Sequence, residues 1–176
     1  RAIKPEVLRL LTFHEKLAGI SLRNTSISSL RGLVLLKNRL RLLDLYGTRT
    51  DDAALETVGR LGQLQELDLG VTRITPAGLA SLKPLGQLRI LELSGRRITD
   101  RAIAAIRPLE TIVQLSLAGT RVTDSGMSGL VSLPRLQALG LAGTRIEGAT
   151  LNSLAKLPRL GLLDMADTDI TGRSLA

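Results

Sequence analysis

Apolar residues recur along the chain at a fixed spacing, which divides it into repeated units. The units begin at Leu17, Leu40, Leu64, Leu88, Ile112, Leu136 and Leu160. The first spacing is 23 residues, and each of the other five is 24. Counted from the start of a unit, positions 4 and 6 are apolar in all seven units, and position 11 is apolar in all but one. So many shared registers predict a repeat protein.

Each unit changes its hydrophobic period internally. Positions 4 and 6 are two residues apart, which is typical of a strand with one buried face. Positions 16, 19 and 22, such as Leu79, Leu82 and Leu85, are three apart and predict a short helix or 3₁₀ turn. Prolines such as Pro84 and Pro108 end that turn. Stacked units should therefore form a parallel sheet over a continuous column of leucines.

Units such as LQELDLGVTRITPAGLASLKPLGQ, residues 64–87, resemble the leucine-rich-repeat family, whose pattern is L-x-x-L-x-L-x-x-N/C-x-L. The resemblance covers residues 17–176 as seven repeats, the last of them truncated. It implies an α/β solenoid: a curved right-handed superhelix with a parallel sheet on the concave side and short helices or 3₁₀ turns on the convex side. The stretches ITDRAI (98–103) and VTDSGM (122–127) also resemble cysteine-containing repeats of substrate-recruiting ubiquitin-ligase subunits. The repeats are loosely similar to bacterial and trypanosomatid ones as well.

Position 9 departs from the family pattern, because it carries Thr where Asn or Cys is usual. The threonines are Thr25, Thr48, Thr72, Thr120, Thr144 and Thr168. A hydroxyl both donates and accepts hydrogen bonds, so we expect these residues to bridge successive turns as a structural ladder. Arg96 takes this position in the fourth unit. Because a buried guanidinium is costly, we expect Arg96 to point outward and to make residues 96–97 a local irregularity.

Position 10 carries an arginine in five consecutive units. The row is Arg49, Arg73, Arg97, Arg121 and Arg145. Position 10 lies between inward positions, so the side chains should point outward, about 4.8 Å apart along one rim. One interpretation is a solvated rim, copied by duplication and partly ion-paired with nearby acids. These acids are Asp51, Asp52, Asp100, Asp124 and Glu147. The other is a docking rail for a partner that carries carboxylates or phosphates.

The concave face should present positions 3, 5, 7 and 8, and position 5 places Asp44, Asp68 and Glu92 side by side. Tyr46, at position 7, is the only large aromatic residue expected on this face. Aromatic residues and Arg are favoured contacts in interfaces, so Tyr46 beside Asp44 and Arg49 is the best expected contact point. The alternative is an ordinary exposed Tyr near the end of a sheet.

Composition narrows the classes of function. The chain is 44% hydrophobic, and Tyr46 and Phe13 are its only aromatic residues. The absence of Cys excludes disulfides, thiolate metal sites and cysteine nucleophiles. No apolar run approaches the ~18 residues of a membrane span. The lack of Cys and of a visible signal peptide favours the cytoplasm, although we expect the chain to be a fragment of a longer protein.

The net charge of +8 is concentrated near the start of the chain. Residues 1–39 hold eight basic residues against two acidic ones, a net charge of +6. Such a basic end suits an acidic protein, a phosphate polymer or an anionic membrane surface. The preferred interpretation is a well-solvated polar cap.

Catalytic, cofactor-binding and metal-binding residues are not expected. His14 has no Ser or Cys nucleophile in a recognisable setting, and the phosphate-loop motifs GxGxxG and GxxxxGK are absent. Carboxylates in the flat row formed by Asp44, Asp68 and Glu92 do not enclose a calcium ion. Nucleic acid is not an expected partner, because the chain lacks the stacking aromatics of single-strand sites.

The start of the chain, residues 1–16, is predicted to be a helical cap or the remnant of an earlier repeat. Its apolar stripe consists of Val7, Leu8, Leu10 and Leu11. For the whole chain, we interpret the pattern as a protein–protein recognition module, with an acidic protein as one option for the partner. Two alternatives stay open. One is a binder of an anionic polymer (nucleic acid, phosphoinositide or glycan) through the arginine rim. The other is the substrate-targeting arm of a ubiquitin-ligase-like enzyme or effector.

Overall fold

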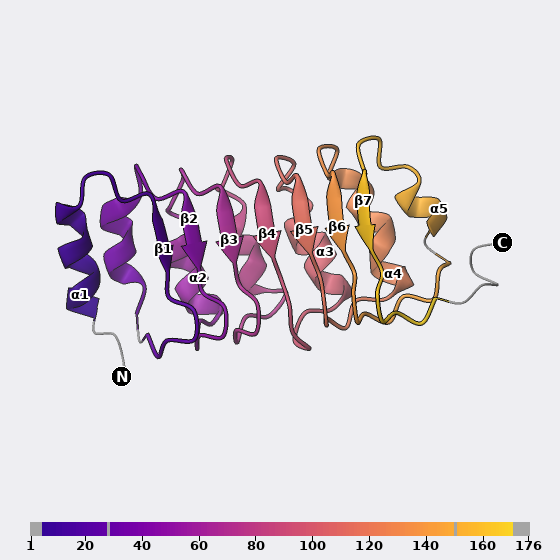
Figure 1. Ribbon diagram of the computed structural model, residues 1–176, viewed down its shortest axis with the longest axis horizontal. Helices are drawn as coiled ribbons and strands as arrows, with labels where there is room; N and C mark the ends of the chain where they lie inside the picture. Colours follow the sequence, from indigo (N-terminus) through magenta and orange to yellow (C-terminus); the bar gives the residue numbers. More distant parts are fainter. Residues whose placement is uncertain (1–4, 28, 150, 171–176) are drawn as a thin grey trace.

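The computed structural model describes residues 5–27, 29–149 and 151–170, and in these residues the strands form one parallel sheet. Seven strands follow one another in sequence order, so each pairs with the strand of the next unit (Figure 1). The strands are β1 (Gly19–Ser21), β2 (Leu42–Asp44), β3 (Glu66–Asp68), β4 (Ile90–Glu92), β5 (Gln114–Ser116), β6 (Ala138–Gly140) and β7 (Leu162–Asp164). Each strand lies in one predicted unit, and the units are called repeats 1 to 7 from here on.

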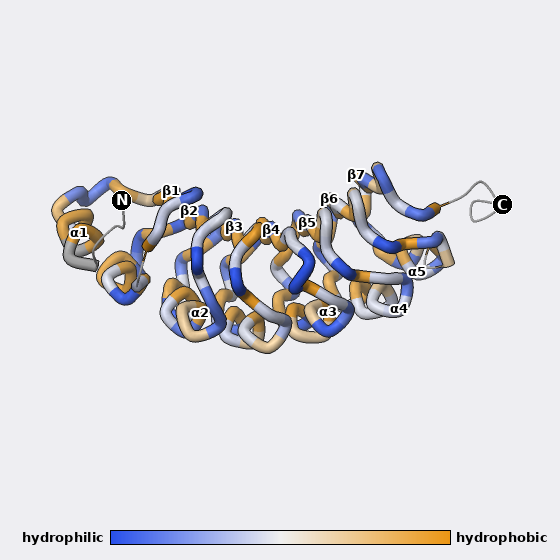
Figure 2. Tube along the Cα trace, turned by 90° about the horizontal axis from the view of Figure 1, so that it is seen from below, coloured by the Kyte–Doolittle hydropathy of each residue, from blue (hydrophilic) through white to orange (hydrophobic). Residues whose placement is uncertain are grey.

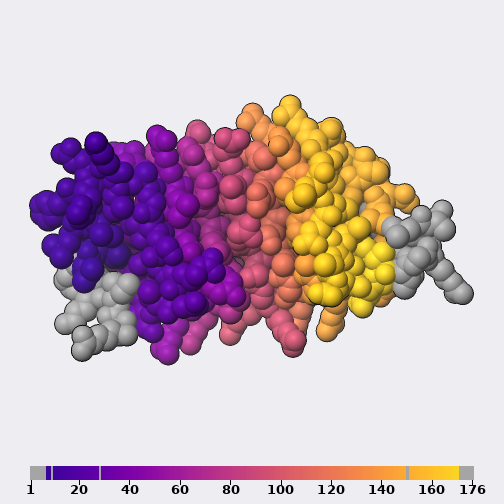
Figure 3. Space-filling model, viewed as in Figure 1, coloured from indigo at the N-terminus to yellow at the C-terminus, as the bar shows by residue number. Residues whose placement is uncertain are grey.

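Short helical segments cover one side of the sheet. They are α1 (Pro5–Leu10), η1 (Leu11–Phe13), η2 (Arg31–Leu36), α2 (Asp52–Val58), η3 (Gly78–Leu82), α3 (Asp100–Ile106), α4 (Asp124–Met127), η4 (Ser128–Ser132) and α5 (Leu151–Leu154), where η denotes a 3₁₀ helix. Figure 2 shows an arc in which the strands line the inner side and the helices the outer side. Figure 3 shows the repeats as successive bands along the long axis. The predicted solenoid architecture is confirmed.

The core is a set of apolar columns that run through the repeats. Position 4 of each strand pairs in register with position 4 of the next, as in Leu67 with Leu91 and Leu91 with Leu115. These three side chains are at most 1% exposed, and Leu79 and Leu82 on the helical side are fully buried. A fully buried Leu contributes about 1.5–3 kcal/mol, so the columns supply the main stabilisation.

The two ends of the arc differ in how their cores are covered. In repeat 7, Leu163, Met165 and Ile170 are only partly buried, and among the described strands β7 pairs with β6 alone. At the other end, Arg39 Nη2 donates a hydrogen bond of 2.8 Å to the Thr12 carbonyl, which ties the N-terminal helical segment to repeat 1.

The predicted apolar stripe of this N-terminal segment is only partly correct. Leu8 is buried and Leu11 packs against the core, whereas Val7 and Leu10 are 46% and 60% exposed. The segment is too short to bury a wider face. The division into a cap and seven repeats remains a prediction, and its ends at residues 1–4 and 171–176 lie outside the described residues.

The threonines at position 9 close turns within single repeats. The Thr120 hydroxyl donates to the Leu117 carbonyl at 2.7 Å, three residues earlier in the same repeat, and Thr144 does the same with Leu141 at 2.6 Å. The expected bridge between successive turns is therefore wrong. Backbone groups make that connection instead, as in the Gly119 N–H, which donates to the Ala142 carbonyl at 2.8 Å.

Repeat 4 carries the expected irregularity. Arg96 is exposed, as predicted for a guanidinium that replaces the usual Thr. The turn around it also differs, since Gly95 has φ +109°, whereas Gly119 and Gly143 both have φ +64°. The Ile98 N–H donates to the Gly95 carbonyl at 3.2 Å. One residue exchange therefore changes the local backbone without interrupting the sheet.

Candidate functional site

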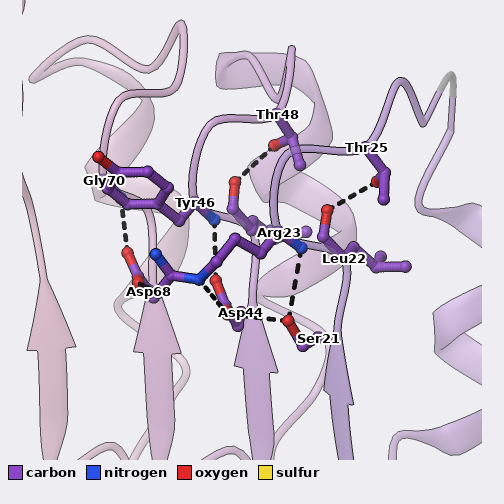
Figure 4. Close-up of polar contacts among 10 residues, drawn as sticks. Ser21, Leu22, Arg23, Thr25, Asp44, Tyr46, Thr48, Asp68 and Gly70 are labelled. Carbon is purple, nitrogen blue, oxygen red and sulfur yellow. Dashed lines mark hydrogen bonds and ion pairs between the residues drawn. The ribbon is translucent and has the colours of Figure 1, made fainter.

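A polar cluster lies on the concave face across β1, β2 and β3, and Arg23 is at its centre (Figure 4). Arg23 follows β1, and its Nε lies 2.9 Å from Oδ2 of Asp44 at the end of β2. Its Nη2 lies 2.8 Å from Oδ2 of Asp68 at the end of β3. One guanidinium thus connects three consecutive repeats. It can do so because the parallel register places these positions next to one another.

The ring of Tyr46 completes the cluster. The Cζ atom of Arg23 lies 4.4 Å from the ring centroid, within the range of a cation–π interaction. The Tyr46 N–H donates to Asp44 Oδ1 at 3.0 Å, and the Gly70 N–H donates to Asp68 Oδ1 at 2.8 Å. Backbone N–H groups therefore orient both carboxylates towards the guanidinium.

The carboxylates of the concave face differ in their pKa values. Burial acts to raise the pKa of Asp44, but the Tyr46 N–H and the other hydrogen-bond donors outweigh burial and lower it. Burial raises the pKa of Asp68, and the neighbouring Asp44 charge adds to this effect, so the ion pair with Arg23 does not reverse it. Burial also raises the pKa of Glu92. The hydrogen bond to Asp44 is the main cause of a raised Arg23 pKa.

A shallow hollow of about 190 Å³ lies between these side chains on β2, β3 and β4. The apolar part of its lining includes Leu42, which is 37% exposed, and Ile90, which is half-buried. The polar part consists of Arg23, Asp44, Glu66, Asp68 and Glu92. Four carboxylates against one guanidinium leave this surface with a net negative charge.

The structure brings most of the predicted concave residues together. Asp44, Asp68 and Glu92 line one hollow, and Tyr46 lies beside its Arg23 wall. Arg49, expected beside Tyr46, is an exposed residue of the turn that follows β2.

The charged neighbour of Tyr46 is instead Arg23, which was not among the expected contact residues. The repeat register of the sequence predicts this contact. Arg23 and Tyr46 occupy position 7 in adjacent repeats, and a parallel register places such positions side by side.

All five arginines of the position-10 row have exposed side chains, and backbone N–H groups of the row hydrogen-bond to the preceding repeat. The Arg121 N–H donates to the Ile98 carbonyl at 2.9 Å, and the Arg145 N–H to the Val122 carbonyl at 3.3 Å. In residues 5–27, 29–149 and 151–170, the ion pairs are those of Arg23, and none involves the row. The interpretation of a partly ion-paired rim is therefore wrong for the described residues.

The acids expected to pair with the row join adjacent repeats or cap a helix. Asp52 accepts hydrogen bonds from the Thr75 N–H at 2.8 Å and from the Thr75 hydroxyl at 2.6 Å. Asp100 accepts the equivalent bonds from Thr123 at 2.7 and 2.8 Å. Asp124 accepts a bond from the Glu147 N–H at 2.9 Å, and Asp51 caps α2 by accepting from the Ala54 N–H at 3.1 Å. Asp52, Asp100 and Asp124 stand at position 13 of their repeats. Position 13 therefore connects adjacent repeats through hydrogen bonds.

Possible metal ligands are dispersed over the described residues. Within them, His, Cys, Asp and Glu side chains do not gather into a group of three that would hold a metal ion. His14 is exposed near the N-terminal end. The helices of the described part are all too short or too polar to cross a lipid bilayer.

Solved structures of internalins, which are leucine-rich-repeat proteins, share this architecture. Internalin C2 from Listeria monocytogenes superposes with a TM-score of 0.75 at 26% identity, covering 98% of this chain and 71% of that one. The chain is a leucine-rich-repeat solenoid. The internalin inlF of the same organism gives a TM-score of 0.75 at 25% identity, covering 96% of this chain and 47% of that one.

No family model matches the chain, and no curated protein matches it either. The likeness of this leucine-rich-repeat solenoid to the internalins supports the general class of protein–protein interaction modules, without indicating a particular partner.

Proposed function

We propose that this chain is a protein-recognition module that binds its partner with the concave face of repeats 1 to 4. The observation that carries the proposal is the cluster in which Arg23 lies over Tyr46 and pairs with Asp44 and Asp68. The likeness to internalins supports the general class. The surface is assigned from the chemistry of the cluster.

The order within the cluster favours binding. Tyr and Arg are enriched among the residues that dominate binding energy in interfaces. Immobilising a long side chain usually costs free energy on association, and Arg23 is already held by two carboxylates and the Tyr46 ring. A partner that packs on Tyr46 therefore meets a preorganised surface.

The hollow indicates the chemistry of the partner. Its net negative charge favours a cationic side chain, since complementary charge gives an interface its specificity and its speed of association. Lys and Arg carry apolar stems that pack on apolar surface while the charged head stays near polar groups. Leu42 and Ile90 would receive such a stem, and Glu92 and Asp68 would receive the head.

Affinity capture with matched baits tests the proposal. The immobilised chain, its Tyr46→Ala variant and an Asp164→Asn variant on repeat 7 are exposed to the same protein mixture. Asp164 is exposed on the concave face away from the cluster, and Asn keeps the bond that it accepts from the Ala166 N–H. A protein retained by the parent and by Asp164→Asn but lost by Tyr46→Ala would support the assigned surface. Equal retention by all three baits would contradict it.

The arginine row supports a second candidate function, the binding of an anionic partner along the rim. Its five guanidiniums are exposed and form no ion pair with the described residues. Charge reversal of Arg73, Arg97 and Arg121 to Glu should abolish such binding, and the parent should lose affinity steeply as salt rises. A captured partner that binds this triple variant normally and shows little salt dependence would contradict this candidate.

A further inference from the structure

A second arginine cluster, separate from the position-10 row, lines a hollow of about 570 Å³. The lining residues are Gly86, Gln87, Arg89, Thr111, Val113, Arg135, Gln137 and Arg159. All of them precede the strands β4 to β7, whereas the row follows the strands. Because the strands are parallel, residues that precede them lie at one end of the strands and residues that follow them lie at the other. The hollow and the row are therefore different surfaces.

The positions of the three arginines follow from the repeat register. Arg89 directly precedes β4, and Arg135 and Arg159 lie three residues before β6 and β7. Arg135 and Arg159 occupy the same position of adjacent repeats, where Gln63 and Gln87 stand earlier in the chain. Neighbouring strands are about 4.8 Å apart, so the cluster extends over roughly 14 Å from β4 to β7.

The polar groups of the hollow are mainly free donors. Arg89, Arg135 and Arg159 are exposed, and in the described part of the chain they form neither ion pairs nor side-chain hydrogen bonds. The Thr111 hydroxyl is occupied, since it donates to the Leu88 carbonyl at 2.7 Å. No acidic residue lines the hollow. Three guanidiniums and two Gln amides therefore face solvent with a local charge of +3.

We propose that this hollow binds an acidic, extended peptide segment of a protein partner. Side chains on one face of an extended peptide are about 6.6 Å apart, so carboxylates on residues 1, 3 and 5 span about 13 Å. That length matches the cluster, and guanidinium forks bind carboxylates in a bidentate manner.

The lining also argues against other anionic ligands. It lacks the aromatic rings on which single-stranded nucleic acid stacks. It also lacks the large apolar side chains that enter a membrane interface. The inference rests on the proposed function only in taking a protein as the partner, and it concerns another surface.

Titration with synthetic peptides tests this assignment. The probe is Glu-Ser-Glu-Ser-Glu with blocked ends, and the comparison peptides are Gln-Ser-Gln-Ser-Gln and Glu-Glu-Glu-Ser-Ser. We expect the alternating acidic peptide to bind most tightly in low salt. The triple variant Arg89→Gln, Arg135→Gln and Arg159→Gln should weaken binding about tenfold, as expected from the loss of exposed ion pairs.

A matched control separates the local site from the net charge. The variant Arg31→Gln, Arg60→Gln and Arg107→Gln removes three exposed charges elsewhere and should bind the acidic peptide like the parent. An equal loss in both triple variants, or equal binding of the Gln peptide, would overturn the proposal. Tighter binding of a sulfated oligosaccharide or an oligothymidylate, abolished by the first triple variant, would overturn the choice of a peptide. None of these outcomes depends on Tyr46, so they leave the proposed function to its own test.

Discussion

The concave face of repeats 1 to 4 and that of repeats 5 to 7 have the same backbone and different chemistry. In both halves each strand pairs in register with the next. The first half presents Arg23, Asp44, Tyr46, Asp68 and Glu92. The second half presents Ser116, Ala118, Gly140, Ala142, Asp164 and Ala166. The inward residues are constrained by the column that they fill, whereas the outward ones are free to differ. Recognition chemistry can therefore be confined to one half.

The largest expected effect is in the shared scaffold. Leu115→Ala, in a central repeat, should lower the free energy of unfolding by about 2–5 kcal/mol, because the surrounding column cannot close the cavity. Leu163→Ala in repeat 7 should cost clearly less, because Leu163 is only partly buried. Urea unfolding followed by circular dichroism measures both. Equal losses would contradict the described burial of the two repeats.

Substitution of a glycine by alanine should have different effects on stability in the two halves. A Cβ at Gly70 would meet the Ser94 hydroxyl and would lie 2.8 Å from Tyr46 Cδ2, so Gly70→Ala should cost about 1–3 kcal/mol and displace the ring. At Gly140 the nearest contact is Ser116 Oγ at 3.4 Å, so Gly140→Ala should change stability by less than ~0.5 kcal/mol. Thermal melts of the two variants compare them directly. If Gly140→Ala proved the more damaging, the second half would not be the open surface described.

The joints between repeats should have a smaller effect in both halves. Asp100→Ala removes two hydrogen bonds to Thr123 and should cost about 1–2 kcal/mol. Pro76 stands at the equivalent position of repeat 3 and offers no acceptor to the Thr99 N–H. Pro76→Asp should therefore be more stable than Pro76→Ala, by about 0.5–1.5 kcal/mol in denaturant unfolding. No difference between these two variants would refute the role of position 13.

The smallest expected effect is a pH dependence of stability that comes from Glu92 in the first half. Burial raises the pKa of Glu92 above its ordinary value of 4.5, so the folded state binds more protons than the unfolded state in that range. The Glu92 contribution to the free energy of unfolding therefore falls as the pH rises through it. The stability of Glu92→Gln relative to the parent should increase from acidic to neutral pH. A difference that stays constant with pH would show that Glu92 is solvated like a free carboxylate.

The fold could be predicted from the sequence because it depends on residues that repeat. Positions 4 and 6 are apolar in every unit and predict the strand, whereas the apolar residues at positions 16, 19 and 22 predict the helical turn on the other side. The outward direction of Arg96 also followed from the cost of burying a guanidinium.

The candidate site was harder to predict, because each of its side chains has several possible partners. Arg23 has Asp44, Asp68 and Tyr46 within reach, and only the geometry shows that it contacts all three. Likewise, Asp52 and Asp100 lie close in sequence to the arginine row, yet they accept hydrogen bonds from the next repeat. A Thr hydroxyl at position 9 also has several possible acceptors, and Thr48 donates to the Leu45 carbonyl of its own turn.

The central claim is that recognition is confined to the first half of the concave face. The most direct test is the dissociation constant of a purified partner, captured with the parent chain, for the parent, Tyr46→Ala and Asp164→Asn. The account predicts at least about 30-fold weaker binding for Tyr46→Ala, since interface residues of this kind contribute about 2 kcal/mol or more. It predicts unchanged binding for Asp164→Asn on repeat 7, with similar thermal melts for all three proteins. Parent-like affinity of a folded Tyr46→Ala variant would contradict the account.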